Sequence, residues 1–251
     1  MSTEGLPSPF RLIAYDTIGS TNDEAKRLAR DGEPEGMVIC AGEQTLGRGR
    51  RGRAWASPPG NLYASILLRP ECSVGAVAQL GFVAALSLAA AIDDLAPKII
   101  IRCKWPNDLL ANEKKVAGIL LETEMTAADH ADFTVVGTGV NLASSPPDTP
   151  YPATSLAAEG AEGIAPTVLV GTYIRHFADY LSLWRAQGFA PIRDAWLARA
   201  AGLGEPIQVR LERSTLDGRF LDLDNDGALL LDLPTGCRRI TAGEIFPAQA
   251  A

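Results

Sequence analysis

The sequence predicts an α+β fold: a mixed β-sheet covered by helices on one side, followed by a small all-β barrel. Three observations predict it. Apolar runs of strand length alternate with helical patterns over the first 200 residues. After Gly204 only short alternating runs remain, separated by turn residues. The chain has 251 residues, 47% of them hydrophobic, which is enough to bury a core. We expect one domain over residues 1–202 and a second over 203–251.

The first half of the chain alternates predicted strands with two predicted helices. Thr21 is the predicted N-cap of the first helix because Glu24 follows three positions later, and Gly32 is placed to end it. The second helix covers residues 74–95. Its most apolar part, residues 77–92, is shorter than the ~20 apolar residues of a membrane span, which favours a buried helix. Short apolar runs predict strands over residues 10–14, 37–42, 62–68 and 99–103.

The second half begins with a predicted hairpin of residues 109–111 and 116–122, with Asn112-Glu113-Lys114 at its turn. A strand over 133–140 and a loop rich in proline and serine over 143–152 follow. Pro166 fits the first turn of a helix whose apolar face carries Leu169, Tyr173, Phe177, Leu181 and Trp184. A second short helix covers 191–200. The barrel strands are 207–211, 219–223, 228–232 and 238–240, separated by turn signals at Asp217-Gly218, Asn225-Asp226-Gly227 and Thr235-Gly236.

Charge and cysteine usage narrow the class of protein. The net charge is −7, whereas a generic nucleic-acid binder is usually basic. A cluster of arginines at 48, 50, 51 and 53 on this acidic body indicates a small anionic ligand. The N-terminus has no basic segment followed by an apolar one, so a secretion signal is not expected. Four cysteines are scattered without a C-x-x-C pair, and Cys40 and Cys103 lie in apolar runs, which predicts reduced thiols in a cytoplasmic protein.

The arginine cluster lies in a glycine-rich segment, residues 47–53, that fits the pattern G-x-G-x-x-G. In a dinucleotide-binding fold this pattern must open a helix, but Ala54-Trp55-Ala56-Ser57-Pro58-Pro59-Gly60 follows and cannot form one. Residues 45–60 instead predict a long mobile loop whose guanidinium groups suit a phosphate-bearing ligand. A solvated or RNA-contacting basic loop is the alternative.

Three further segments place polar groups at the ends of predicted strands. In Lys104-Trp105-Pro106-Asn107-Asp108, proline forces a sharp exit from the strand, and an ordinary turn with a packed tryptophan is the alternative. Lys115 opens an apolar strand that also contains Gly118, and a surface lysine at a hairpin is the alternative. Residues 137–142 end a buried strand with two glycines and Asn141.

Taken together and in this order, the motifs closely resemble those of the biotin–protein ligase family, over residues 10–247. The glycine-rich loop with Trp55, the Lys104 to Asp108 segment and the Lys115 to Leu120 strand carry the resemblance. Ser20-Thr21-Asn22, Gln44, Gly139-Val140-Asn141 and Gly243-Glu244-Ile245 also match. The resemblance implies a class II synthetase-like catalytic domain and an SH3-like C-terminal barrel. It also implies that biotin is adenylated by ATP with Mg²⁺ and passed to a lysine of a biotin carboxyl carrier protein, as in acetyl-CoA carboxylase.

The resemblance also implies the roles of individual residues. Lys115 would stabilise charge on the reacting carboxylate and α-phosphate, and Trp55 would cover the adenylate. The implied catalytic residues are Arg50, Lys104, Asp108 and Lys115. The implied biotin-binding residues are Ser20, Thr21, Asn22, Gln44, Gly47, Arg48, Arg50, Lys115 and Gly118. The implied ATP and adenylate residues are Arg48, Arg50, Arg53, Trp55, Asn107, Asp108 and Asn141. The metal-binding residues are left open.

Two departures from the family and two rival functions bear on this interpretation. Only about ten residues precede the core, so a helix-turn-helix domain, nucleic-acid binding and membrane binding are not expected; a homodimer is left open. Leu46 stands where the family has a small residue.

A lipoate–protein ligase or octanoyltransferase shares the fold, but the transferase needs a nucleophilic cysteine. A non-catalytic RNA-binding module is the rival from another class. His176 lies in a predicted amphipathic helix and is interpreted as structural.

Overall fold

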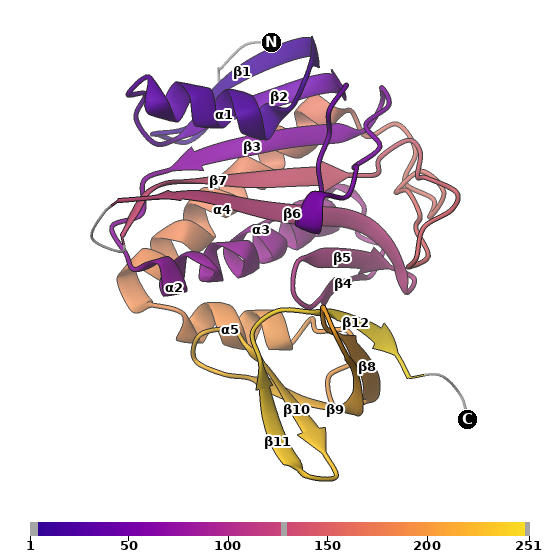
Figure 1. Ribbon diagram of the computed structural model, residues 1–251. Coiled ribbons are helices and arrows are strands. Elements are labelled where there is room, and N and C mark those ends of the chain that lie inside the picture. Colours follow the sequence, from indigo (N-terminus) through magenta and orange to yellow (C-terminus); the bar gives the residue numbers. More distant parts are fainter. Residues whose placement is uncertain (1–4, 127–129, 249–251) are drawn as a thin grey trace.

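The computed structural model describes residues 5–126 and 130–248. The prediction that the N-terminus has no secretion signal rests partly on residues 1–4, which lie outside the described residues. Its largest element is a seven-stranded sheet in the order β1-β2-β3-β7-β6-β5-β4 (Figure 1). Strands β1 and β2 are parallel and all other neighbours are antiparallel, which confirms the mixed sheet. The strands are β1 (Arg11–Ile18), β2 (Met37–Gln44), β3 (Leu62–Leu68), β4 (Ile101–Lys104), β5 (Asp108–Ala111), β6 (Lys114–Met125) and β7 (Ala131–Val140).

Helices cover both faces of this sheet, not one as the sequence predicted. They are α1 (Thr21–Arg30), α2 (Val74–Val77), α3 (Gln79–Leu95), α4 (Pro166–Gln187) and α5 (Ala190–Leu197). On β2, Val38 and Cys40 belong to the core that includes α3 and α4, whereas Met37 and Ile39 face the opposite way. There α1 packs through Ala25 and Ala29, whose small side chains allow close approach to the strands.

The long apolar helix is buried, as predicted. The segment Gly75–Leu95 is long and apolar enough to cross a membrane by composition, but most of it is buried inside the protein. It is divided into α2 and α3. Pro166 begins α4, and the five residues predicted for its apolar face are all buried. Both helix predictions are therefore confirmed, apart from the division of the first.

The first helix begins one residue earlier in the chain than predicted. Ser20, not Thr21, is the N-cap: its backbone is extended and its hydroxyl accepts from the backbone N–H of Asp23, with 3.5 Å between oxygen and nitrogen. Glu24 does not close a capping box, because its carboxylate binds Arg27 and Tyr15 instead. The shift makes Thr21 the first helical residue, and its side chain then points toward Gln44.

The C-terminal part forms a five-stranded antiparallel sheet in the order β11-β10-β9-β8-β12. Its strands are β8 (Pro206–Arg210), β9 (Thr215–Leu223), β10 (Leu229–Leu233), β11 (Gly236–Ile240) and β12 (Glu244–Pro247). The outer strands β11 and β12 do not pair in the described chain, so the sheet is open rather than a closed barrel. The domain boundary at residues 202 and 203 stays a prediction.

The turn predicted at Asp217-Gly218 is wrong, because both residues lie inside β9. A Cβ on Gly218 would lie 2.5 Å from the carbonyl oxygen of Asp232, so this glycine allows close approach of strands rather than a reversal. The signals at Asn225-Asp226-Gly227 and Thr235-Gly236 do separate strands. The hairpin at Asn112 and Glu113 is also confirmed, and both residues have the positive φ of a tight turn.

Candidate active site

A cavity of about 210 Å³ lies beside the start of α1, over the part of β6 and β7 that the helix leaves open. The glycine-rich loop crosses in front of these strands and closes one side (Figure 1). The C-terminal sheet contributes Glu244 and Phe246. The structure thus gathers nearly all predicted site residues around one cavity: Ser20, Thr21, Asn22, Gln44, Arg48, Arg50, Arg53, Trp55, Lys104, Asn107, Asp108, Lys115, Gly118 and Asn141.

Gly47, the remaining predicted residue, does not line the cavity but supports the loop. A Cβ there would lie 2.4 Å from the carbonyl oxygen of Trp55. The Trp55 N–H donates to the Gly47 carbonyl at 2.9 Å, and the Gly49 N–H donates to the Arg53 carbonyl at 2.7 Å. The predicted irregular loop is therefore a narrow hairpin with a short 3-10 turn, Arg50–Gly52, at its tip. Leu46 is 67% exposed just before this hairpin.

Two glycines shape the cavity floor. Gly118 of β6 and Gly139 of β7 are directly paired, and together they form a flat platform. The indole of Trp55 lies on it: a Cβ on Gly139 would be 2.6 Å from Trp55 Cε2, and one on Gly118 would be 3.1 Å from Trp55 Cζ3. The Trp55 Nε1 atom is buried and has no hydrogen-bond partner in the described residues.

A cradle of hydroxyl and amide groups lies at the start of α1. Gln44 Oε1 accepts from the Thr21 backbone N–H at 2.9 Å and from the Thr21 hydroxyl at 3.0 Å. The Gln44 amide donates to Ser57 Oγ at 3.1 Å, and the Ser57 hydroxyl donates to the Trp55 carbonyl. The predicted Ser20-Thr21-Asn22 and Gln44 are thus held together, and sequence reasoning missed Ser57.

Asn22 extends the same network to the far side of the cradle. Gly137 makes room for it, since a Cβ there would lie 2.3 Å from Asn22 Oδ1. The Asn22 amide donates to Glu122 Oε2 at 2.7 Å, and its Oδ1 lies 2.6 Å from the buried hydroxyl of Ser65. An amide oxygen can only accept, so the Ser65 proton is directed to Asn22. Sequence reasoning missed Ser65 and Glu122, although Ser65 is visible as a small polar residue in an apolar strand.

The charged end of the cavity is built on the hairpin of β4 and β5. Lys104 and Asp108 are paired across it, and Trp105 in the turn is buried, with its indole N–H donating to the Gly227 carbonyl at 3.1 Å. Asp108 Oδ2 lies 3.3 Å from Lys104 Nζ, and Asp108 Oδ1 lies 2.5 Å from Lys115 Nζ. Burial raises the pKa of the Asp108 carboxyl, but these two ammonium groups outweigh it and leave that pKa lowered. Burial lowers the pKa of Lys104.

Arg50 completes this charged end. Its Nη1 donates to Asn107 Oδ1 at 3.1 Å and to the Gly243 carbonyl at 3.3 Å, and burial lowers the pKa of its guanidinium. Three cationic groups, Arg50, Lys104 and Lys115, therefore surround the single carboxylate of Asp108. The excess positive charge, partly removed from water, suits an anionic ligand.

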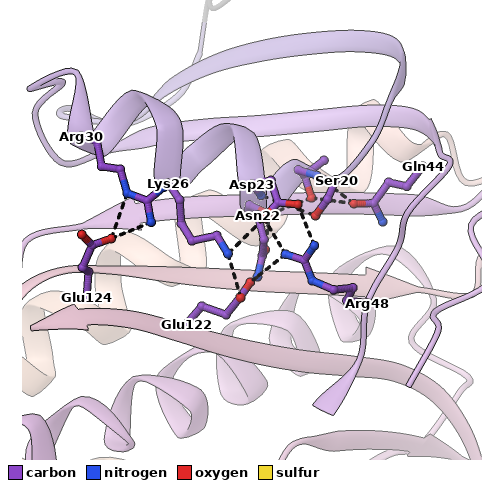
Figure 2. Close-up of polar contacts among 11 residues, drawn as sticks. Ser20, Asn22, Asp23, Lys26, Arg30, Gln44, Arg48, Glu122 and Glu124 are labelled. Carbon is purple, nitrogen blue, oxygen red and sulfur yellow. Dashed lines mark hydrogen bonds and ion pairs between the residues drawn. The ribbon is translucent and has the colours of Figure 1, made fainter. Parts of the chain in front are cut away.

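The other two predicted arginines reach the cavity edge but direct their guanidinium groups elsewhere. Arg48 binds both carboxylate oxygens of Asp23 at 2.6 Å (Figure 2). Arg53 binds Glu244 of β12. Asn141, which also lines the cavity, donates to the Thr154 carbonyl at 3.0 Å. The sequence also missed two aromatic residues there, Tyr151 and Phe246, which belong to no motif; Lys104 Nζ lies 4.4 Å from the Tyr151 ring centre.

The histidine and cysteine side chains of the described residues, the other candidates for metal binding or catalysis, lie outside this cavity. Within residues 5–126 and 130–248, no group of three or more histidine, cysteine or acidic residues is placed to hold a metal ion. None of the four cysteines lines the cavity, and burial raises the pKa of the Cys40 and Cys103 thiols to about 12. His176 contacts Asp94 at 2.7 Å between α4 and α3, in keeping with a structural role.

Comparisons with known proteins identify relatives of this chain by sequence and by fold. Residues 15–141 match the biotin/lipoate A/B protein ligase family, and residues 202–246 match the biotin protein ligase C terminal domain. The chain is 42% identical to a biotin–[acetyl-CoA-carboxylase] ligase of Paracoccus denitrificans, over 90% of this chain and 96% of that protein. It is 35% identical to a bifunctional ligase/repressor of Bacillus subtilis, over 93% of this chain and 73% of that protein. A biotin protein ligase from Aquifex aeolicus, solved with biotin and ATP, matches with a TM-score of 0.80 and 28% identity, over 94% of this chain and 97% of that one.

Proposed function

The chain belongs to the biotin/lipoate A/B protein ligase family, and we propose that it adenylates biotin with ATP and transfers the biotinyl group to a carrier-protein lysine. The acceptor we propose is the biotin carboxyl carrier domain of acetyl-CoA carboxylase. The observation that carries the proposal is the cavity itself, in which an uncharged polar cradle lies beside a partly buried cluster of three cations around the carboxylate of Asp108. Such a site suits a ligand that is neutral at one end and anionic at the other.

The two ends of the cavity match the two ends of biotin. Thr21, Asn22 and Gln44 offer hydroxyl and amide groups for the ureido ring, with Ser20 beside them. Lys115 belongs to the charged end, where the biotin carboxylate would meet the α-phosphate of ATP. Trp55, on its glycine platform, covers the ligand. Asn107, Asp108 and Asn141 lie on the nucleotide side, next to Arg50.

The proposed reaction needs no protein nucleophile. A carboxylate oxygen of biotin attacks the α-phosphorus of ATP, the bond to the β-phosphate oxygen breaks, and pyrophosphate leaves. The acceptor lysine amine, after losing a proton, attacks the mixed anhydride carbonyl, and AMP leaves. Lys115 and Arg50 offset the negative charge that collects on the carboxylate and α-phosphate, and Asp108 fixes the positions of Lys104 and Lys115.

We propose that Mg²⁺ enters as part of the MgATP substrate. Asp108 is already held by two lysines, and Glu244, which also lines the cavity, is bound to Arg53, so the described residues offer no separate cluster for a resident ion. A Mg²⁺ ion that keeps most of its waters and binds substrate phosphates fits this environment. We further propose a cytoplasmic enzyme that acts on protein rather than nucleic acid or membrane, with homodimer formation open to measurement of mass in solution.

Pyrophosphate release by the purified protein tests the proposal. With ATP and biotin but no carrier, we expect a burst near one equivalent per enzyme, because the adenylate is retained. Lipoate in place of biotin should give none. A lipoate-dependent burst would assign the chain to the lipoate branch of the family, and silence with both acids would refute the first half-reaction. Transfer of labelled biotin to a carrier domain tests the second.

Two rival functions fit the structure less well. An octanoyltransferase requires a nucleophilic cysteine, but the cavity contains none, and the two buried thiols are held protonated by their raised pKa. An RNA-binding loop would use several free guanidinium groups, whereas three of the four in this loop, those of Arg48, Arg50 and Arg53, are engaged with protein groups. Salt-sensitive RNA binding without ATP turnover would favour the second rival.

A further inference from the structure

Two carboxylates outside the cradle hold the base of the glycine-rich loop. Asp23 of α1 makes a two-pronged contact with the Arg48 guanidinium, at 2.6 Å to each oxygen, and Glu122 of β6 lies 3.6 Å from Arg48 Nη2. Figure 2 shows Arg48 pointing between these two carboxylates, with Lys26 completing the cluster. Lys26 Nζ lies 3.0 Å from Asp23 and 2.9 Å from Glu122. Two cations thus alternate with two carboxylates.

The same Glu122 also holds the cradle. Its Oε2 accepts from the Asn22 amide, and Oε2 is also the atom nearest Arg48. One carboxylate therefore links a residue proposed to bind biotin with a residue of the loop proposed to cover the adenylate. At the other end of the hairpin, Trp55 is tied through Ser57 to Gln44 of the same cradle. Both ends of the loop are fixed to the cradle, while its tip at Arg51 and Gly52 is exposed.

We propose that Asp23 and Glu122 form a carboxylate clamp that fixes Arg48, and with it the base of the loop, beside the biotin cradle before any ligand binds. Arg48 is then a positioning residue whose guanidinium contacts protein rather than phosphate. The clamp rests on the proposed function only for its effect on biotin. Its two-pronged geometry supports it, because a guanidinium and a carboxylate that meet through two hydrogen bonds have a fixed relative orientation.

The pKa of Asp23 agrees with a clamp that persists at neutral pH. The hydrogen bond from Arg48 is the largest influence on it and lowers the pKa to about 2, with Lys26 adding to the effect. Lys26, Asn22 and Arg48 likewise lower the pKa of Glu122 against the opposing effect of burial. Both carboxylates therefore stay charged through the range in which enzymes of this kind are assayed.

Trypsin provides a direct test because the loop contains four arginines. Cleavage after Arg48 requires its guanidinium to leave Asp23 and enter the protease, whereas Arg51 and Arg53 are exposed. We expect first cuts in the wild-type chain after Arg51 or Arg53. Asp23→Asn should raise the initial rate after Arg48 by about fivefold, near the upper range for a partly exposed pair, with the rates at the tip unchanged. Glu122→Gln, which keeps an acceptor for the Asn22 amide, should raise the cleavage rate after Arg48 less than Asp23→Asn does.

Glu124→Gln is the matched control. Glu124 lies two residues beyond Glu122 on β6 and also binds an arginine of α1, Arg30, at 2.8 Å, but it does not contact the loop (Figure 2). This variant should leave every cleavage rate at the wild-type value. First cuts are counted by intact-mass spectrometry at low conversion. Equal acceleration at all four arginines, or no change in Asp23→Asn, would overturn the clamp.

Biotin kinetics give an independent readout that a merely structural role would not produce. In the pyrophosphate assay run with carrier domain present, so that the enzyme turns over, Asp23→Asn should raise KM for biotin about fivefold and leave kcat near the wild-type value, since the cations at the charged end are untouched. Arg48→Met should raise KM equally, and adding Asp23→Asn to it should add nothing. Additive effects, or a collapse of kcat in Arg48→Met, would place the guanidinium on the reacting groups instead. Absence of pyrophosphate release in the wild type would refute the proposed function while the proteolysis test stands.

Discussion

The platform under Trp55 leads to a prediction about one methyl group. In Gly139→Ala, the new Cβ would lie 2.6 Å from both Trp55 Cε2 and Trp55 Nε1, whereas carbon atoms in contact are usually about 3.5–4.0 Å apart. Strand β7 cannot retreat, because Gly139 is paired with Tyr63 on one side and Gly118 on the other. The indole must therefore move by roughly 1 Å or leave the platform.

The cost of this overlap sets the expected magnitude. Overpacking of this kind costs about 1–3 kcal/mol. If the loop relieves it by moving Trp55, binding of the adenylate should weaken by the same amount, or roughly 5- to 150-fold. Gly118→Ala should be milder, because its Cβ would lie 3.1 Å from the indole and 3.3 Å from the flexible end of Lys115.

Adenylate retention and tryptophan quenching measure the effect together. Retention is the lifetime of biotinyl-adenylate on the enzyme without carrier protein. Acrylamide quenching should rise in Gly139→Ala because the other tryptophans, Trp105, Trp184 and Trp196, are buried and respond little. The matched control is Gly137→Ala on the same strand, whose Cβ would strike Asn22 rather than Trp55.

The control should weaken biotin binding without a change in quenching. Gly81→Ala in α3, where the Cβ meets only Leu121 at 3.6 Å, should leave both measurements unchanged. If Gly139→Ala kept the wild-type adenylate lifetime and wild-type quenching, the indole would not lie on these glycines. The role of Trp55 as a cover would then be refuted.

Three further predictions concern the charged groups. Arg50→Gly removes a cation from the charged end and should weaken the hold on the adenylate by about 2–4 kcal/mol, measured as free biotinyl-adenylate released into solution; a wild-type lifetime would contradict this. Lys115→Ala should depress adenylate synthesis itself, and normal pyrophosphate release would remove Lys115 from the catalytic residues. For Asp23, the pKa is lowered on folding to about 2, so the stability it contributes is present above its unfolded value of about 3.9 and is lost as pH falls through about 2. The difference in unfolding free energy between wild type and Asp23→Asn should therefore be constant near neutral pH and shrink only below about pH 4; a difference that vanished near pH 6 would rule this out.

Local patterns were enough to predict the elements whose cause is local. The hairpin at Asn112 and Glu113, the start of α4 at Pro166 and the strand 62–68 follow from turn chemistry and apolar periodicity. The gathering of the site residues was predicted only because several motifs matched a family together, since each alone had an ordinary structural explanation.

What the sequence did not reveal depends on contacts between distant segments. The turn signal of Asp217-Gly218 was misleading because the close approach of Asp232, which makes the glycine necessary, is a long-range fact. Asp23 and Glu122 belong to no motif, and their importance arises only when α1 and β6 bring them to the same guanidinium. A sequence pattern within one segment does not predict a contact between side chains from two distant segments.

The contacts of Arg50 with the Gly243 carbonyl and of Arg53 with Glu244 have a consequence for dissecting the protein. They join residues that are separated by 193 and 191 positions in the chain. A fragment ending near residue 202 would keep the cradle and the lysines at 104 and 115. It would lose the groups that bind Arg50 and Arg53. To preserve these two contacts, a C-terminal sheet grafted from another protein would have to bring a carbonyl and a carboxylate to the same two arginines.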